Sequence, residues 1–108
     1  MNRDTNRKRV RELSTAIFGA RYRLEICAAL YARSTVTAVE LLNEFSHTEE
    51  PPSQASISVE LKRLCGAGLL SRITPTPGDR HRPLAVVESP IWKAAADLVD
   101  TTERKRAR

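Results

Sequence analysis

Residues 53–70 of the chain are Ser53-Gln54-Ala55-Ser56-Ile57-Ser58-Val59-Glu60-Leu61-Lys62-Arg63-Leu64-Cys65-Gly66-Ala67-Gly68-Leu69-Leu70, and they predict a helix that runs into an extended segment. Ser53 is a good N-cap residue, and the prolines before it disfavour an earlier helix start. Gly66 and Gly68 supply the conformational freedom that ends a helix, and an apolar run resumes after them. The chain is therefore expected to turn from helix into strand here.

The predicted helix has two different faces. One is an apolar stripe at helical spacing, expected to be buried: Ile57, Leu61, Leu64 and Cys65. The opposite face carries small, hydroxyl-bearing and basic side chains: Ala55, Ser56, Val59, Lys62 and Arg63. Because this second set contains no acidic or aromatic group, the helix could lie close to a nucleic-acid groove.

The length and charge of the chain limit which kinds of protein it can be. A chain of 108 residues is expected to form one domain and is too short for an enzyme on a large sheet scaffold. The net charge is +5 and the pI about 9.8, and basic residues cluster at both ends of the chain. Such clusters could bind phosphate backbones or anionic lipid, or they could simply be solvated termini. These clusters are Arg3, Arg7, Lys8, Arg9 and Arg11, and Arg104, Lys105, Arg106 and Arg108. The expected division is a basic arm over 1–8, a domain over 9–101 and a basic tail over 102–108.

Compartment and cysteine usage are also constrained. No apolar segment approaches the ~20 residues that span a bilayer, and the N-terminus lacks the apolar core of a secretory signal, so a cytoplasmic protein is expected. Cys27 and Cys65 each stand on an apolar helical face, far apart in sequence. Buried packing is the favoured interpretation of both thiols, with a redox pair as the alternative.

The remaining pattern completes a mainly α fold with a small β-hairpin. Helices are expected over about 9–18, 20–32 and 37–45, the last capped by Thr37, and a polar loop over 46–52 is longer than the usual turn before the next helix. Strands are expected over 69–74 and 84–88, with a long basic tip between them. Ser89-Pro90 opens a final helix. The predicted order is four helices, a hairpin and a fifth helix.

With these residues, the chain resembles the winged helix-turn-helix regulators, most closely the ArsR-like family of dimeric bacterial repressors. The resemblance covers roughly Ile17 to Val99, and it is strongest over Ser53–Ser58, Leu61–Leu64 and Gly68–Leu70. A second match is Arg23-Leu24-Glu25-Ile26-Cys27, which is similar to the family's Arg-Leu-x-Ile-Leu segment. The family's fold implies that the helix at 54–66 is a DNA-recognition helix and that the hairpin is its wing.

The resemblance also implies which residues contact DNA. Short polar side chains of the recognition helix would approach base edges or phosphates, and long cations there and at the wing tip would attract phosphate. Glu60 stands where the family usually has a polar or basic residue, so it could accept from cytosine or pair with a neighbouring cation. The expected DNA-binding residues are Ser53, Gln54, Ser56, Ser58, Val59, Lys62, Arg63, Arg80, His81 and Arg82.

Metal sensing, which many members of that family perform, is not expected. Thr37 and Val39 occupy the positions of the family's usual cysteine pair, and the last helix contains no histidine. His47 and His81 are expected to be exposed in polar loops. We therefore predict neither a metal site nor a cofactor.

The first and last predicted helices carry more apolar residues than a small core absorbs. We therefore predict a homodimer in which these helices pair across a two-fold axis, with packing inside one chain as the alternative. The expected interface residues are Val10, Leu13, Ile17, Ile91, Trp92, Leu98 and Val99.

No nucleophile with a nearby base and no phosphate-cradling loop is evident, so an enzyme is not expected. The predicted function is a sequence-specific regulator of transcription, expected to repress by binding an inverted repeat in double-stranded DNA, with an unknown effector and no membrane partner. Two alternatives stay open. One is a winged-helix module for protein interaction, and the other a sequence-indifferent nucleoid or plasmid protein.

Overall fold

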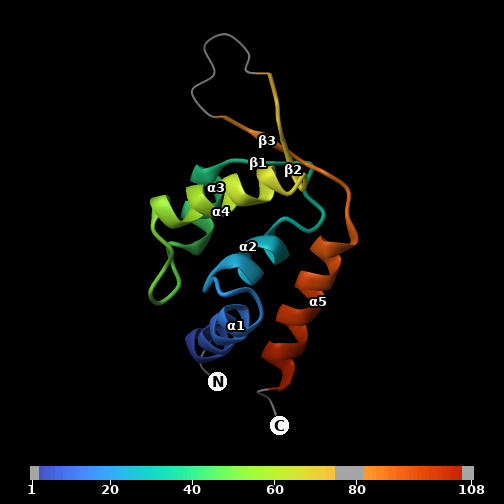
Figure 1. Cartoon of the computed structure of the whole chain (residues 1–108). Coiled ribbons are helices and arrows are strands. Elements are labelled where there is room, and N and C mark those ends of the chain that lie inside the picture. Colours follow the sequence, from blue (N-terminus) through green and yellow to red (C-terminus); the bar gives the residue numbers. More distant parts are fainter. Residues whose placement is uncertain (1–2, 75–81, 106–108) are drawn as a thin grey trace. The chain divides into compact units, whose positions relative to one another are not determined.

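The computed structural model describes residues 3–74 and 82–105. The chain divides into two compact units, each with its own set of elements (Figure 1). We call Met1–Tyr31 with Pro90–Arg108 the helical unit, and Ala32–Ser89 the sheet unit. The chain therefore leaves the helical unit after Tyr31 and returns to it at Pro90.

The helical unit consists of α1 (Arg3–Phe18), α2 (Arg23–Ala29) and α5 (Pro90–Lys105), and each of these helices packs against the other two. Gly19 ends α1 with a left-handed backbone (φ 68°), and its N–H donates to the carbonyl of Thr15. The buried apolar residues of the unit are Val10, Leu24, Ile26, Cys27, Leu30, Trp92 and Ala95.

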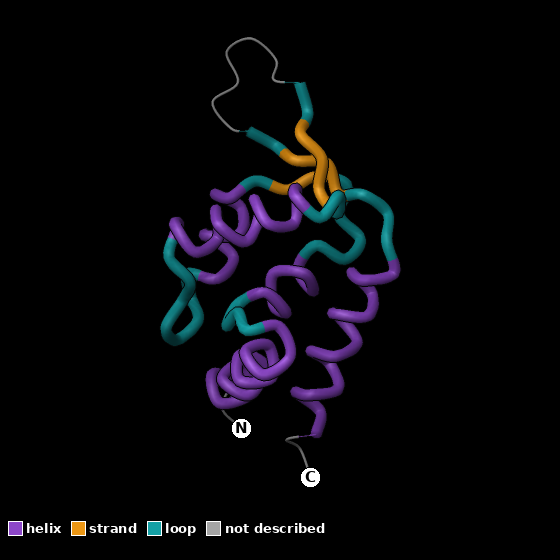
Figure 2. Tube along the Cα trace, viewed as in Figure 1, coloured by secondary structure: helices purple, strands orange, loops and turns teal. Residues whose placement is uncertain are grey.

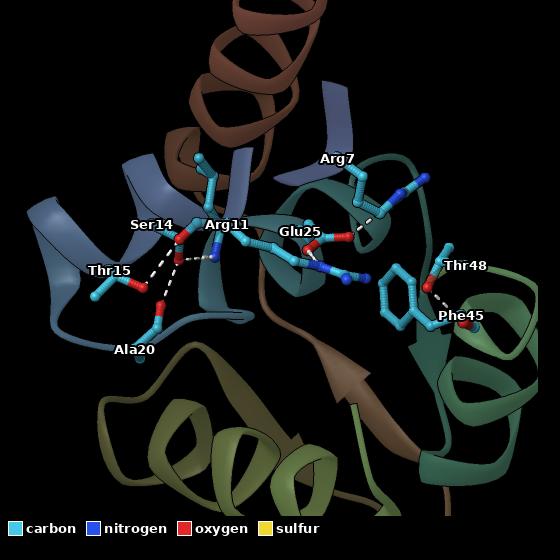
Figure 3. Close-up of polar contacts among 9 residues, drawn as sticks. Arg7, Arg11, Ser14, Thr15, Ala20, Glu25, Phe45 and Thr48 are labelled. Carbon is cyan, nitrogen blue, oxygen red and sulfur yellow. Dashed lines mark hydrogen bonds and ion pairs between the residues drawn. The ribbon is translucent and has the colours of Figure 1, made fainter. Parts of the chain in front are cut away.

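Two arginines of α1 share one buried carboxylate of α2 (Figure 3). Arg7 Nη1 lies 2.5 Å from Glu25 Oε2, and Arg11 Nε lies 2.7 Å from Glu25 Oε1. Ser14, also buried, accepts from the N–H of Leu24 and donates to the carbonyl of Ala20. Because a buried charge is costly unless it is paired, these contacts fix α2 against α1. Arg7 and Arg11, which the sequence grouped with the basic N-terminal cluster, are thus structural residues.

The sheet unit contains the elements in the order β1 (Thr35–Val36), α3 (Ala38–Phe45), α4 (Gln54–Gly66), β2 (Leu70–Arg72) and β3 (Leu84–Val86). The three strands form one antiparallel sheet in the order β1-β3-β2 (Figure 2). The expected hairpin is present as β2 and β3, but β1 was not expected. Its pairing with β3 links segments far apart in sequence, and a 2.8 Å bond from the N–H of Val86 to the carbonyl of Ser34, just before β1, extends it.

The capping predictions for α3 and α4 are confirmed. The Thr37 hydroxyl accepts from the N–H of Glu40, whose carboxylate accepts from the N–H of Thr37, so α3 begins with a capping box. The Ser53 hydroxyl accepts from the N–H of Ser56 at the start of α4. A long connection between the two helices is also confirmed.

The end of α4 follows the predicted turn, with one change of detail. Gly68 adopts the left-handed conformation (φ 79°), and the N–H of the following Leu69 donates to the carbonyl of Leu64 at 2.9 Å. Gly66 is instead the last helical residue. This turn directs the chain from α4 into β2.

Several boundaries differ from those expected. Helix α1 begins at Arg3 instead of about residue 9, and α5 continues to Lys105. Helix α2 is shorter than the expected span of 20–32, and both hairpin strands are shorter than expected. Fraying changes helix ends by about one or two residues, so the earlier start of α1 is a real extension, in line with the pairing of Arg7 with Glu25 of α2. Over the residues that the structure describes, no helix has the length and apolar character to cross a membrane.

Candidate nucleic-acid interface

One side of α4 presents the polar and basic surface that the sequence predicted. Ser53, Gln54, Ser58, Val59, Lys62 and Arg63 are exposed, and Ser56 is half-buried. Gln54, Ser58 and Lys62 follow one another at intervals of four residues and so form a row along the helix. Ala55, Val59 and Arg63 form the adjacent row. The structure therefore brings this part of the predicted DNA-binding set onto one helical surface.

The residues on that surface differ in what they offer a ligand. Ser53 is committed to the helix start, because its hydroxyl caps Ser56 and also donates to the Ser56 hydroxyl at 3.1 Å. Gln54 and Ser58 carry side chains that both donate and accept hydrogen bonds. Val59 is 48% exposed, which places an apolar side chain between polar neighbours. The surface has the mixture of short polar, apolar and cationic groups with which helices read base edges and phosphates.

Glu60 lies on the other side of α4. It is only 6% exposed and belongs to the buried face with Ile57, Leu61 and Leu64. Its Oε1 lies 3.8 Å from Nη1 of Arg63, whose side chain remains mostly exposed. Of the two roles considered for Glu60, the structure therefore supports pairing with a neighbouring cation, and its burial excludes contact with cytosine. Sequence reasoning missed that this carboxylate joins the buried stripe.

The wing is described in part. Arg82 is exposed two residues before β3, whereas Arg80 and His81 lie outside the described residues. Sequence reasoning missed Arg72, which is exposed at the end of β2 opposite Leu84. Because side chains alternate along a strand, Arg72 stands on the same face of the sheet as the buried Leu70. The signal that could have identified it was a cation within the predicted strand 69–74, next to the basic wing tip.

Acidic residues of the sheet unit gather on α3 and the loop after it: Glu40, Glu44, Glu49 and Glu50, all exposed. Arg33 forms an ion pair with Glu44 at 2.5 Å beside a shallow depression of about 680 Å³. Among the described residues, no three His, Cys, Asp or Glu side chains gather as metal ligands would. His47 is exposed. This acidic surface therefore belongs to α3 and the loop, and the cations Lys62, Arg63, Arg72 and Arg82 belong to α4 and the wing.

Neither Cys27 nor Cys65 forms a disulfide in the structure. Cys27 is buried in α2, as predicted, and Cys65 is half-buried near the end of α4. Each belongs to a different unit of the chain.

The predicted dimer residues are of three kinds. Val10 and Trp92 are buried, at 1% and 4% exposure, so their side chains are already used within one chain. Leu13, Ile91 and Val99 are half-buried. Ile17 of α1 and Leu98 of α5 are 53% and 40% exposed, so their side chains are accessible to a partner.

With this geometry established, the fold is a winged helix: two helices, α3 and α4, followed by a β-hairpin, with further helices on either side in sequence. Solved structures show the same fold. A mutant MarR from E. coli complexed with operator DNA matches with a TM-score of 0.62 at 17% identity, covering 94% of this chain and 71% of that one. The winged helix-turn-helix expected from the sequence is therefore confirmed.

A second solved structure agrees. The YusO protein from Bacillus subtilis matches with a TM-score of 0.56 at 14% identity, covering 95% of this chain and 68% of YusO. The sequence itself matches no protein-family model and no curated protein. At these levels of identity the likeness establishes the fold alone.

Proposed function

We propose that the protein is a regulator of transcription that binds double-stranded DNA through α4. The observation that carries this proposal is the exposed surface of α4, on which Gln54, Ser58 and Lys62 form one row. An α-helix fits the major groove of B-DNA, where each base pair presents a distinct pattern of donors and acceptors. The amide of Gln54 would read a base edge, and Lys62 with Arg63 would contact phosphates. The similarity to MarR, which was solved with operator DNA, supports this proposal.

The wing would contribute contacts outside the major groove. Arg72 is exposed at the end of β2, Arg82 is exposed two residues before β3, and Arg80 and His81 are assigned to the tip from the sequence. Contacts to phosphate carry no sequence information directly, so these cations would add affinity for any duplex. The proposal assigns no catalytic step and no cofactor to the protein.

We further propose that the protein acts as a homodimeric repressor on an inverted repeat, as the ArsR-like resemblance implied. The solved neighbours are MarR and YusO, so the ArsR-like placement itself stays a prediction. Two exposed apolar residues support dimerisation through the helical unit, because Ile17 and Leu98 would be covered by a second copy. Each protomer would then place its α4 in one half-site, with half-sites about one helical turn apart.

Dimerisation is tested by analytical ultracentrifugation. The wild-type chain is expected to sediment as a dimer at micromolar concentration, and Leu98→Glu is expected to shift it to monomer because it introduces charge into an apolar interface. Val39→Glu, at an apolar position of similar exposure on α3, is the matched control and is expected to stay dimeric. A wild-type chain that sediments only as monomer would contradict the dimer.

Base readout and phosphate contact are separated by two substitutions. Gln54→Ala is expected to change which duplex is preferred, whereas Arg82→Ala is expected to weaken all duplexes and reduce the slope of log K against log salt by about 0.9 per protomer. Titrations of a selected and a random duplex by fluorescence anisotropy measure both effects. Equal losses on the two duplexes for Gln54→Ala would remove this residue from base readout.

A further inference from the structure

The two units carry very different charge. The helical unit contains twelve Lys and Arg against six Asp and Glu, whereas the sheet unit contains six against seven. The basic character of the whole chain therefore comes from the unit that lacks α4 and the wing. Long-range attraction to a polyanion depends on net charge, so the sheet unit alone provides little of it.

Part of the charge of the helical unit is neutralised by internal pairs. Glu25 is shared by Arg7 and Arg11, and Lys93 donates to Asp97 at 2.8 Å on α5. The hydrogen bond to Asp97, reinforced by the charge of Asp97, raises the pKa of Lys93. The pairs named above do not include Lys8 and Arg9, which are exposed on α1.

A shallow depression of about 440 Å³ gathers cations from α1 and the turn that follows it. Its lining is Lys8, Arg11, Glu12, Thr15, Ala16 and Arg21. Lys8 and Arg21 are exposed at this site, Glu12 is the one acidic residue in the lining, and Arg11 is buried. Because Arg11 is already paired with Glu25, the charge of the depression comes from Lys8 and Arg21 against Glu12, which leaves it positive by about one charge.

Tyr22 holds two of these cations in place. The guanidinium carbon of Arg11 lies 4.9 Å from the centroid of the Tyr22 ring, and that of Arg21 lies 5.6 Å from it. Cation–π contacts at these distances restrict the arginine side chains. Arg21 is thus an exposed cation whose position is set by the fold, which lowers the entropic cost of binding an anion.

We propose that this depression, which we call the α1 depression, is a second DNA-binding surface that takes a backbone phosphate between Lys8 and Arg21. The inference rests on the proposed function and assigns a division of labour: α4 selects the sequence, and the α1 depression supplies salt-dependent affinity for any duplex. DNA is the favoured occupant because its phosphate charge complements the unit that holds the excess of cations. Glu12 lowers the local potential and makes the site weaker than a purely cationic one.

The experiment compares Lys8→Gln/Arg21→Gln with Lys93→Gln in the full chain. Dissociation constants for a selected duplex and a random duplex are measured from 50 to 300 mM NaCl by fluorescence anisotropy. The double variant is expected to reduce the slope of log K against log salt by about 0.9 per protomer, the value for one phosphate, and to lose on the order of tenfold in affinity at low salt, equally on both duplexes. Lys93→Gln removes an exposed helical lysine of the same unit and is expected to bind as wild type.

The single variant Lys8→Gln is included because it is not expected to affect folding. Lys8 is exposed and takes no part in the contacts with Tyr22. This variant is expected to give half of the change in slope. Suppose that the wild-type chain binds DNA, and that Lys8→Gln and the double variant both show the wild-type slope of log K against log salt. The α1 depression is then not a DNA-binding surface, and the proposed binding of DNA by α4 is unaffected. If the wild-type chain binds neither duplex, the proposed function and this inference are both overturned.

Discussion

Glu25→Ala is expected to destabilise the protein by about 3–5 kcal/mol, the cost of removing one partner from a buried ion pair. The side chains of Glu25 and Arg11 are 2% and 4% exposed, so the substitution would leave the Arg11 guanidinium buried without its carboxylate. Arg7 would lose the same partner but is about one third exposed, so water can replace part of that contact. Because a small domain is stable by only about 5–15 kcal/mol, the variant would lose a large fraction of its stability.

Urea unfolding followed by circular dichroism measures this effect. Glu12→Ala removes an exposed carboxylate from α1 and serves as the control, with an expected change below about 0.5 kcal/mol. Arg11→Met combined with Glu25→Leu replaces the pair by apolar groups and is expected to recover much of the loss. A destabilisation below about 1 kcal/mol for Glu25→Ala would show that the pair does not hold α2 against α1.

Lys62→Glu is expected to weaken DNA binding on the order of 100-fold, because it replaces a phosphate-attracting charge on α4 with one that phosphate repels. Lys62 is exposed and does not belong to the buried face of α4. The thermal unfolding midpoint of the variant is therefore expected to stay close to that of wild type. Anisotropy titration at 100 mM salt with a selected duplex measures the loss.

The matched control for this charge reversal is Lys93→Glu. Lys93 is also an exposed lysine on a helix, but it lies on α5 and pairs with Asp97. The control is expected to lose no more than a few-fold in affinity, through the change in net charge alone. Equal losses for the two variants would mean that total charge, and not the surface of α4, controls binding.

Much of the fold could be predicted because its signals are local. Thr37 and Ser53 cap the helices that follow them, and a glycine ends α4, as residues of these types do in many proteins. The apolar stripe of Ile57, Leu61 and Leu64 fixed which side of α4 is buried, and hence which side faces outward. The predicted surface of α4 followed from that periodicity.

The features that sequence reasoning missed depend on contacts between distant segments. Strand β1 is only two residues long, and it is defined by its pairing with β3 near residue 85. The pairing of Arg11 with Glu25 joins two helices, and both residues looked like ordinary surface charges in the sequence. Glu60 stands three residues after Ile57, so helical periodicity places it on the buried stripe, but a charged residue type there is normally expected to be exposed. Propensity and periodicity describe single segments, and burial of charge is decided by the partner segment.

Selection of sheared genomic DNA on the purified protein, with sequencing of the bound fragments at low and high salt, tests the central claim most directly. The account predicts enrichment of an inverted repeat that persists at the higher salt, because base contacts by α4 are less sensitive to salt than phosphate contacts. Uniform recovery of fragments that disappears at high salt would contradict sequence-specific binding and favour a sequence-indifferent DNA-binding protein. No recovery at either salt would contradict DNA binding altogether and favour a protein-interaction module.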